Sequence, residues 1–214
     1  MIGRLADWQI SKSSNHHIIK SIMIAIIKYN AGNITSVENA IKRLDLPCKV
    51  TDNIDEILCA DKVIFPGVGE AKSAMNYLRQ RELDEVIKSL LQPVLGICLG
   101  LQLMCRHSEE GDTGCLGIFD TEVKKFPARD IVPHMGWNNL EKVQTPLFRD
   151  FAKEDTVYFV HGYYAELCKD TIAQCDYILP FSAAMRRDNF YATQFHPEKS
   201  GSVGERILEN FLRL

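Results

Sequence analysis

A cysteine flanked by glycines is the first candidate for chemistry. In Gly96-Ile97-Cys98-Leu99-Gly100 it follows an apolar run and precedes a helical pattern. A nucleophile on a sharp strand-to-helix turn needs a strained backbone, and small neighbours let that turn close. The helix N-terminus would favour the thiolate, and the N–H of Leu99 could donate to a developing oxyanion. A buried structural cysteine between two helix-packing glycines explains the segment equally well.

A histidine and a glutamate near the C-terminus could supply the base and its orienting partner. They occur in Thr193-Gln194-Phe195-His196-Pro197-Glu198. In extended chain, positions i and i+2 point to the same face, so His196 and Glu198 can lie side by side. A carboxylate beside a histidine fixes its tautomer and stabilises the imidazolium. Cys98, His196 and Glu198 could therefore form an acyl-transfer triad. Taken alone, the segment is better explained by a histidine capping a turn and a solvated glutamate.

A third segment, Phe65-Pro66-Gly67-Val68-Gly69, follows another apolar run. Glycines tolerate positive φ and allow close approach of the backbone, so amides of this loop could complete an oxyanion hole. The alternative is an ordinary glycine-rich turn. The segment is not a phosphate loop, because no Gly-Lys-Ser or Gly-Lys-Thr follows it.

The elements that must position these residues alternate through the first half of the chain. Strands are expected at 23–27, 48–51, 63–65 and 93–97. Helices are expected at 34–44 with Asn33 as cap, at 54–59, in two segments within 75–91, and at 99–105. Buried strands alternating with helices indicate βαβ units and a mainly parallel sheet.

The second half is richer in strands. They are expected at 116–126, 138–143, 156–167, 171–178, 183–187 and 189–195. A final helix is expected to begin with a capping box formed by Ser202 and Glu205. The predicted fold is a single α/β domain, with a central mainly parallel sheet flanked by helices and added antiparallel strands.

Composition narrows the class of protein. The 214 residues include 46% hydrophobic and 25% charged residues, with a net charge of −3, as is typical of a globular domain. The slight acidity argues against nucleic-acid or anionic-membrane partners. No stretch approaches a membrane span. We interpret residues 22–214 as one domain and residues 1–21 as an N-terminal extension, either flexible or introduced by cloning; a helical decoration of the core is the alternative.

The cysteine usage indicates a reducing, cytoplasmic location. The seven cysteines form an odd set without a Cys-x-x-Cys pair. This argues against a disulfide framework and against a clustered zinc site. No metal is expected.

Together these segments resemble the class I (triad-type) glutamine amidotransferases, in which the same three motifs occur in the same order. Four further segments resemble the glutaminase subunits (HisH) of imidazole glycerol phosphate synthase within that family. They are Lys28-Tyr-Asn-Ala-Gly-Asn33, Pro133-His-Met-Gly-Trp-Asn138, Tyr158-Phe-Val-His-Gly-Tyr163 and His196-Pro-Glu-Lys-Ser-Gly201. The likeness extends from about Met23 to the C-terminus.

The resemblance implies hydrolysis of L-glutamine to glutamate and ammonia, without a cofactor. Cys98 would attack the side-chain amide, and His196 would protonate the departing ammonia and then activate water. The ammonia would pass to a (β/α)₈-barrel cyclase subunit (HisF), the partner in a heterodimer. That subunit would make imidazole glycerol phosphate and an aminoimidazole carboxamide ribonucleotide in histidine biosynthesis.

The resemblance also implies roles for individual residues. The oxyanion hole would involve Val68, Gly69 and Leu99. Glutamine would be bound by Gly67, Gln102, Glu110, His161, Gly162 and Tyr163. The cyclase interface and ammonia passage would include Trp137, Asn138, Tyr158 and Lys199. Read without the family, Glu110 is a surface charge, Trp137 could be core packing and Lys199 a solvated cation; His107 and His134 receive no role.

The chain departs from the family at two positions. The family more often has Ser where Gly162 stands and Met where Leu101 stands, and a lost hydroxyl contact could weaken glutamine binding. The family also implies that the Val68 loop can rest with an amide turned away until the cyclase and its nucleotide bind. The competing interpretations are a glutaminase serving another synthase, a catalytically silent subunit on the same fold, and a free-standing cysteine hydrolase.

Overall fold

The computed structural model describes residues 22–29, 32, 34–144 and 146–214. The extension expected at 1–21 and the helix cap expected at Asn33 lie outside these residues. The strands are β1 Ile24–Ile27, β2 Cys48–Thr51, β3 Lys62–Gly67, β4 Val94–Cys98, β5 His107–Ser108, β6 Thr113–Gly114, β7 Glu122–Lys125, β8 His134–Asn139, β9 Thr156–His161, β10 Tyr163–Ala165, β11 Thr171–Asp176, β12 Pro180–Arg187 and β13 Phe190–Thr193. The helices are α1 Ile34–Arg43, α2 Ile54–Cys59, α3 Ala71–Gln80, α4 Leu83–Ser89, α5 Leu99–Met104, the 3₁₀ helix η2 Pro197–Lys199 and α6 Gly201–Leu212.

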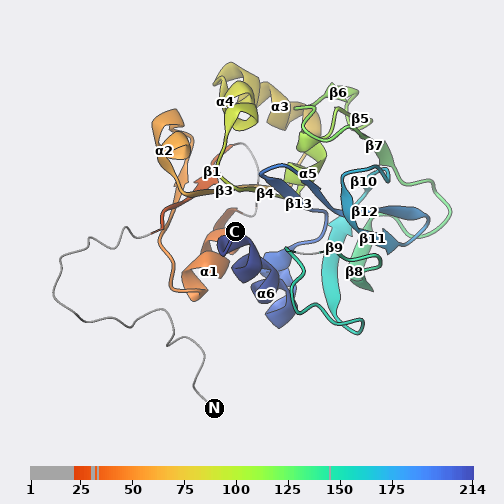
Figure 1. Cartoon of the computed structure of the whole chain (residues 1–214). Coiled ribbons are helices and arrows are strands. Elements are labelled where there is room, and N and C mark those ends of the chain that lie inside the picture. The colour runs from red at the N-terminus through yellow and green to blue at the C-terminus, as the bar shows by residue number, and fades with distance from the viewer. Residues whose placement is uncertain (1–21, 30–31, 33, 145) are drawn as a thin grey trace, which may run out of the picture.

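A seven-stranded sheet forms the centre, in the order β11-β12-β13-β4-β3-β1-β2 (Figure 1). The strands from β13 to β2 pair in parallel, as the buried apolar runs predicted. The strands β12 and β11 extend this sheet in antiparallel pairing. Since β4 and β13 are adjacent, the segments that carry Cys98 and His196 leave the sheet side by side.

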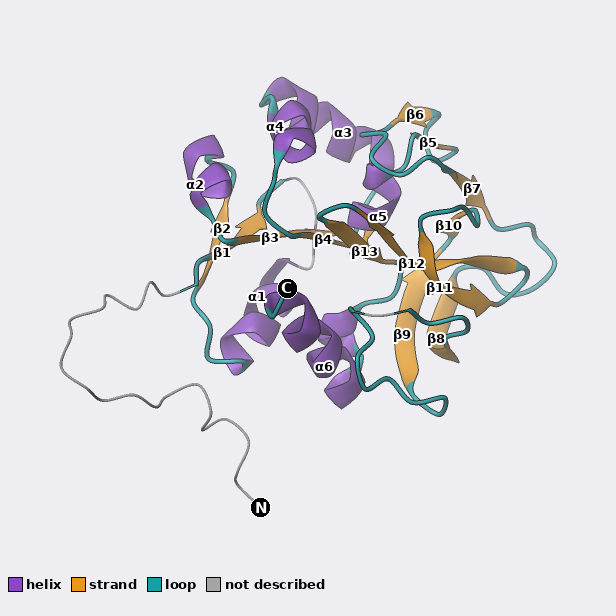
Figure 2. Cartoon of the chain, viewed as in Figure 1, coloured by secondary structure: helices purple, strands orange, loops and turns teal. Residues whose placement is uncertain are grey.

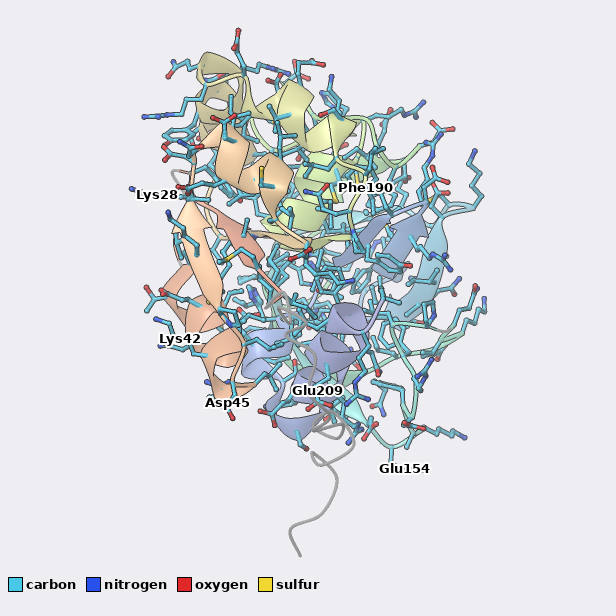
Figure 3. The ribbon with its side chains drawn as sticks, turned by 60° about the vertical axis from the view of Figure 1, so that its left-hand side comes forward. Lys28, Lys42, Asp45, Glu154, Phe190 and Glu209 are labelled. Atoms are coloured by element: carbon cyan, nitrogen blue, oxygen red, sulfur yellow. The ribbon has the colours of Figure 1, made fainter. Side chains whose placement is uncertain are left out.

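Helices cover both faces of the sheet (Figure 2). The helices α1 and α6 lie on one face, where Ile41 and Phe211 join a core with Phe159 and Phe195. The helices α2 to α5 lie on the other face, where Leu78 packs with Phe65 and other apolar residues. Charged side chains such as Lys42 and Glu209 lie on the outside of the molecule (Figure 3). Among the described residues, no helix combines the length and apolar composition needed to cross a bilayer.

Two smaller sheets lie beside the seven-stranded one in the described part of the chain. One has the order β10-β7-β5-β6, and the other is the β8–β9 ribbon. The strand expected at 156–167 is interrupted at Gly162, so that β9 and β10 pair in different sheets. The strand expected at 138–143 instead occupies 134–139. The prediction missed its start because the buried residue there, His134, is polar rather than apolar.

Two other local predictions were wrong. Within 116–126 only 122–125 form a strand; Leu116 and Phe119 are buried in a loop, with their N–H groups bonded to carbonyls of α5. The predicted capping box is absent, because α6 begins at Gly201 and Ser202 already lies inside it. Ser200 precedes the helix, but its hydroxyl donates to the His196 carbonyl at 2.7 Å instead of capping the helix.

Candidate active site

The sharp turn predicted around Cys98 is present. Cys98 ends β4 and immediately precedes α5, with φ 54° and ψ −104°. Residues other than glycine rarely adopt such a backbone conformation. Gly100 allows α5 to pack closely on β3, since a Cβ there would lie 2.0 Å from the Phe65 carbonyl oxygen. The turn thus holds a thiol that is only 6% exposed at the carboxyl end of the parallel sheet.

His196 and Glu198 form a buried pair beside this turn. The Nδ1 atom of His196 lies 2.8 Å from Oε1 of Glu198, and the two side chains are 1% and 0% exposed. Because a carboxylate accepts, Nδ1 carries the hydrogen. The His196 N–H donates to the Tyr158 carbonyl at 2.9 Å, which ties the residue to β9.

The electrostatics of His196 connect it to both neighbours. Burial lowers the pKa of His196, but interactions with Cys98 and Glu198 outweigh burial and raise this pKa to about 10. The Nε2 atom has no conventional hydrogen-bond partner among the described residues. It is therefore available to take or give a proton at the cysteine and at a bound substrate.

A cavity of about 200 Å³ opens beside Cys98. Most of its lining was singled out from the sequence: Val68, Gly69, Cys98, Leu99, Gln102, Glu110, His161, Gly162 and Tyr163. Pro133 and Val160 complete it. Gly67 is buried behind the lining, in register with Cys98 across β3 and β4. A cavity of this volume, lined by both polar and apolar groups, suits a small polar molecule rather than a large ligand.

Two polar side chains are fixed at this cavity. The Oε2 atom of Glu110 accepts from the Ala71 N–H at the start of α3, at 2.8 Å. Burial raises the pKa of Glu110, while that hydrogen bond lowers it. The Nε2 atom of Gln102 donates to the Tyr163 carbonyl at 3.0 Å and to Oε1 of Gln194 at 3.1 Å. The surface-charge interpretation of Glu110 is thereby disfavoured.

The 67–69 loop is held by the segment after β1. The Gly32 N–H donates to the Val68 carbonyl at 3.2 Å. Gly69 has φ +133°, which requires glycine in practice. The Tyr29 hydroxyl is buried against Gly67, 1.9 Å from where a Cβ on that glycine would lie. The loop thus reaches the cavity in a defined but glycine-dependent conformation.

The residues expected to face a partner lie on the β8–β9 ribbon and on η2. Trp137 and Tyr158 are cross-strand neighbours with ring centroids 5.9 Å apart, and Trp137 is 56% exposed. Lys199 is exposed on η2. Asn138 is only partly exposed, and its Nδ2 atom donates to the Asp176 carbonyl at 3.2 Å. The structure therefore supports Trp137 as a surface residue rather than as core.

Sequence reasoning missed two residues, one beside the nucleophile and one on the ribbon. Gln194 donates from Nε2 to the Cys98 sulfur at 3.6 Å, although it was quoted only as part of the His196 segment. Met135, on the ribbon near Trp137, is 63% exposed and enlarges the apolar surface there. Its alternation with the buried His134 is the signal that could have revealed it.

Comparison with known proteins agrees with this geometry. The family model for glutamine amidotransferase class-I matches residues 25–214. The imidazole glycerol phosphate synthase subunit HisH of Bacteroides thetaiotaomicron is 59% identical over 194 residues, covering 89% of this chain and 99% of the relative. The subunit of the same name from Pasteurella multocida is 47% identical over 191 residues, covering 88% and 96%.

Solved structures show the same fold. The crystal structure of a putative GMP synthase protein from Thermoplasma acidophilum superposes with a TM-score of 0.70 at 21% identity, covering 93% of this chain and 94% of that one. The predicted α/β architecture is thus confirmed. The chain belongs to the class I glutamine amidotransferase family and, within it, to the HisH subunits of imidazole glycerol phosphate synthase.

Proposed function

We propose that this protein is the glutaminase subunit of imidazole glycerol phosphate synthase and hydrolyses glutamine to glutamate and ammonia. The observation that carries the proposal is the buried His196–Glu198 pair, 2.8 Å apart, whose imidazole interacts with Cys98 at the strained turn beside the cavity. A silent subunit would have no chemical need for this arrangement. The 59% identity to a HisH subunit supports the assignment to histidine biosynthesis.

The first half-reaction forms a thioester. The Cys98 sulfur attacks the carbon of the glutamine side-chain amide, and the N–H of Leu99 with an amide of the 67–69 loop donates to the oxyanion. His196 gives its proton to the leaving nitrogen, which departs as ammonia. Water then attacks the thioester with His196 as base, releasing glutamate and restoring the thiol. Glu198 keeps Nδ1 protonated and stabilises the imidazolium in both steps.

Polar groups around the cavity suit the two ends of glutamine. Glu110, fixed by the Ala71 N–H, would pair with the substrate ammonium. Backbone groups of His161, Gly162 and Tyr163 would hold the carboxylate end, and Gln102 would contact the substrate from α5. With glycine at 162 only backbone contacts are available there, so affinity at that position does not depend on a hydroxyl.

The proposed partner is a cyclase subunit, HisF, that receives the ammonia in the cytoplasm. Trp137 and Met135 form an exposed apolar surface on β8, and exposed aromatic residues of this kind are enriched in protein interfaces. Tyr158 is the cross-strand neighbour of Trp137, and its carbonyl accepts from the N–H of His196, the residue before η2, on which Lys199 is exposed. A partner docked here would cover the side of the triad through which ammonia would leave.

The Val68 loop would adjust to that partner. In the conformation present here the Val68 carbonyl is occupied by the Gly32 N–H. Glycines on either side of Val68 make a peptide rotation inexpensive. If the isolated chain turned glutamine over as fast as the complex, this part of the proposal would be wrong.

The test is ammonia release from glutamine, measured for the chain alone and with the cyclase and its nucleotide ligand. Wild type should be active with the cyclase, Cys98→Ser inactive, and Cys59→Ser, an exposed thiol on α2, as active as wild type. Equal activity with and without the cyclase would indicate a glutaminase that serves another synthase. Absence of activity in every mixture would refute the glutaminase.

A further inference from the structure

A pair of buried histidines lies at the end of the β8–β9 ribbon that borders the cavity, and the proposed reaction does not use their side chains. His134 and His161 are cross-strand partners, with Nδ1 of His134 3.1 Å from Nε2 of His161. Their exposed fractions are 3% and 5%. The His134 ring is stacked between Tyr177, at 4.0 Å, and Phe159, at 4.7 Å between ring centroids. Its orientation is therefore fixed by packing.

The hydrogen bonds assign one tautomer to each ring. Nδ1 of His161 lies 2.8 Å from the Tyr163 carbonyl, which can only accept, so this nitrogen carries the hydrogen. Burial lowers the pKa of His161 to about 3 and that of His134 to about 4, so both rings are neutral at pH 7. Nε2 of His161 must then accept, and Nδ1 of His134 must donate to it. Nε2 of His134 is left as an acceptor, 3.4 Å from Nδ2 of Asn138.

This chain of hydrogen bonds ends at a carbonyl that also serves the active site. The Tyr163 oxygen accepts from His161 on one side and from Gln102 on the other. Gln102 also donates to Gln194, which in turn donates to the Cys98 sulfur. Both lone pairs of one backbone oxygen are thus used, and the 161–163 segment is held from two directions.

We propose that His134 is a positioning residue for the glutamine pocket. Its Nδ1–H donates to His161, keeps that ring in the Nδ1–H tautomer, and so holds the Tyr163 carbonyl and the 161–163 segment in place for the substrate. The proposal rests on the glutaminase function proposed above. Without the donor, the buried Nε2 of His161 has no partner, and a proton moved to Nε2 would break the bond to Tyr163.

Two substitutions separate the hydrogen bond from the packing. His134→Asn places an amide donor near the position of Nδ1 but removes the stacked ring. His134→Phe keeps a stacked ring but removes the donor. We expect His134→Phe to raise KM for glutamine about tenfold, as when a buried acceptor loses its donor, with little change in kcat. The KM of His134→Asn for glutamine should stay within about threefold of the wild-type value, because the asparagine amide keeps most of the hydrogen bond to His161.

The kinetics should be measured with the full chain in complex with the cyclase, and the rate of Cys98 alkylation by iodoacetamide serves as a control for the conformation of the turn at Cys98. Alkylation should be equal in all three proteins. If His134→Asn is impaired as much as His134→Phe or more, packing matters rather than the hydrogen bond, and the proposal is overturned.

The tautomers can be read directly in the wild-type chain, without relying on activity. Long-range ¹H–¹⁵N spectra of histidine-labelled protein at pH 7.5 should show the Nδ1–H form for both rings, with His134 identified by its missing signals in His134→Asn. An Nε2–H form or a charged ring at either position overturns the network. If the wild-type protein were inactive, the proposed glutaminase function would be refuted. The observed tautomers would then by themselves show whether the His134–His161 hydrogen bonds exist.

Discussion

Replacing Gly67 by alanine tests how closely the 67–69 loop is packed. The backbone of Gly67 needs no special conformation, but an added Cβ would lie 1.9 Å from the Tyr29 hydroxyl oxygen. Ordinary contact begins at 3.4 Å, so the overlap is 3.4 − 1.9 = 1.5 Å. The Tyr29 ring is buried and packs on Phe65 with ring centroids 5.3 Å apart, so it has no room to move away.

The size of the effect follows from the overlap. Overpacking in a core costs about 1–3 kcal/mol, and we expect Gly67→Ala to lower the free energy of unfolding by about 3 kcal/mol. Tyr29→Phe removes the obstructing oxygen, and the remaining neighbours of the new Cβ lie at 3.1 Å, which needs only a small shift. The hydroxyl has no hydrogen-bond partner among the described residues, so its removal should raise stability by about 1 kcal/mol. The double variant should therefore recover about 2 kcal/mol beyond additivity.

Urea unfolding of the four proteins, followed by circular dichroism, measures this coupling. Gly69→Ala is the matched control, because a Cβ there has open space and its cost comes only from φ +133°. Tyr29→Phe should not rescue Gly69→Ala. The reasoning is refuted if Gly67→Ala and Tyr29→Phe combine additively, or if both glycine variants are rescued alike.

Three further predictions follow from the site. Cys98→Gly should raise the free energy of unfolding by about 1 kcal/mol while abolishing activity, since glycine relieves the strained φ and ψ; an unchanged urea midpoint would contradict this. Glu198→Gln should lower the pKa of His196 in NMR titrations. Because that pKa is raised to about 10, the imidazolium stabilises the fold below the unfolded pKa of about 6.5, and this contribution is lost as pH rises towards 10. Stability should thus fall less steeply with pH in Glu198→Gln than in wild type, and equal slopes would count against the pairing. Trp137→Ala should weaken binding of the proposed cyclase about tenfold in calorimetry, as expected for an exposed aromatic residue that the interface would bury, whereas Leu91→Ala, which removes an exposed leucine after α4, should not.

The sequence predicted the sheet well where strands are buried on both sides. The runs that became β1, β3 and β4 are apolar through most of their length, so periodicity and length sufficed. It failed at β8, whose buried residue is a histidine, and at Leu116, which a loop rather than a strand buries. The hydrophobic pattern predicts which residues are buried, but it does not specify whether a strand or a loop buries them.

The candidate site divides in the same way. Cys98, His196 and Glu198 could be proposed because motif spacing and local geometry indicate a nucleophile, a base and an orienting group. Gln194 could not, because its role depends on contacts with Cys98 and Gln102, residues 96 and 92 positions away. Such contacts arise from strand order, which the one-dimensional pattern leaves open.

The place of β13 in the sheet has a consequence for how the protein is made. Cys98 and His196 are 196 − 98 = 98 residues apart, and β13 must insert between β12 and β4 before they meet. At about 5–20 residues per second, a ribosome adds those residues in roughly 5–20 seconds. Throughout that interval one edge of β4 lacks its final partner strand, and Cys98 lacks His196, its proposed base. A nascent chain therefore has no means of releasing ammonia until nearly the whole domain has been synthesised, and fragments ending before Phe190 should be inactive.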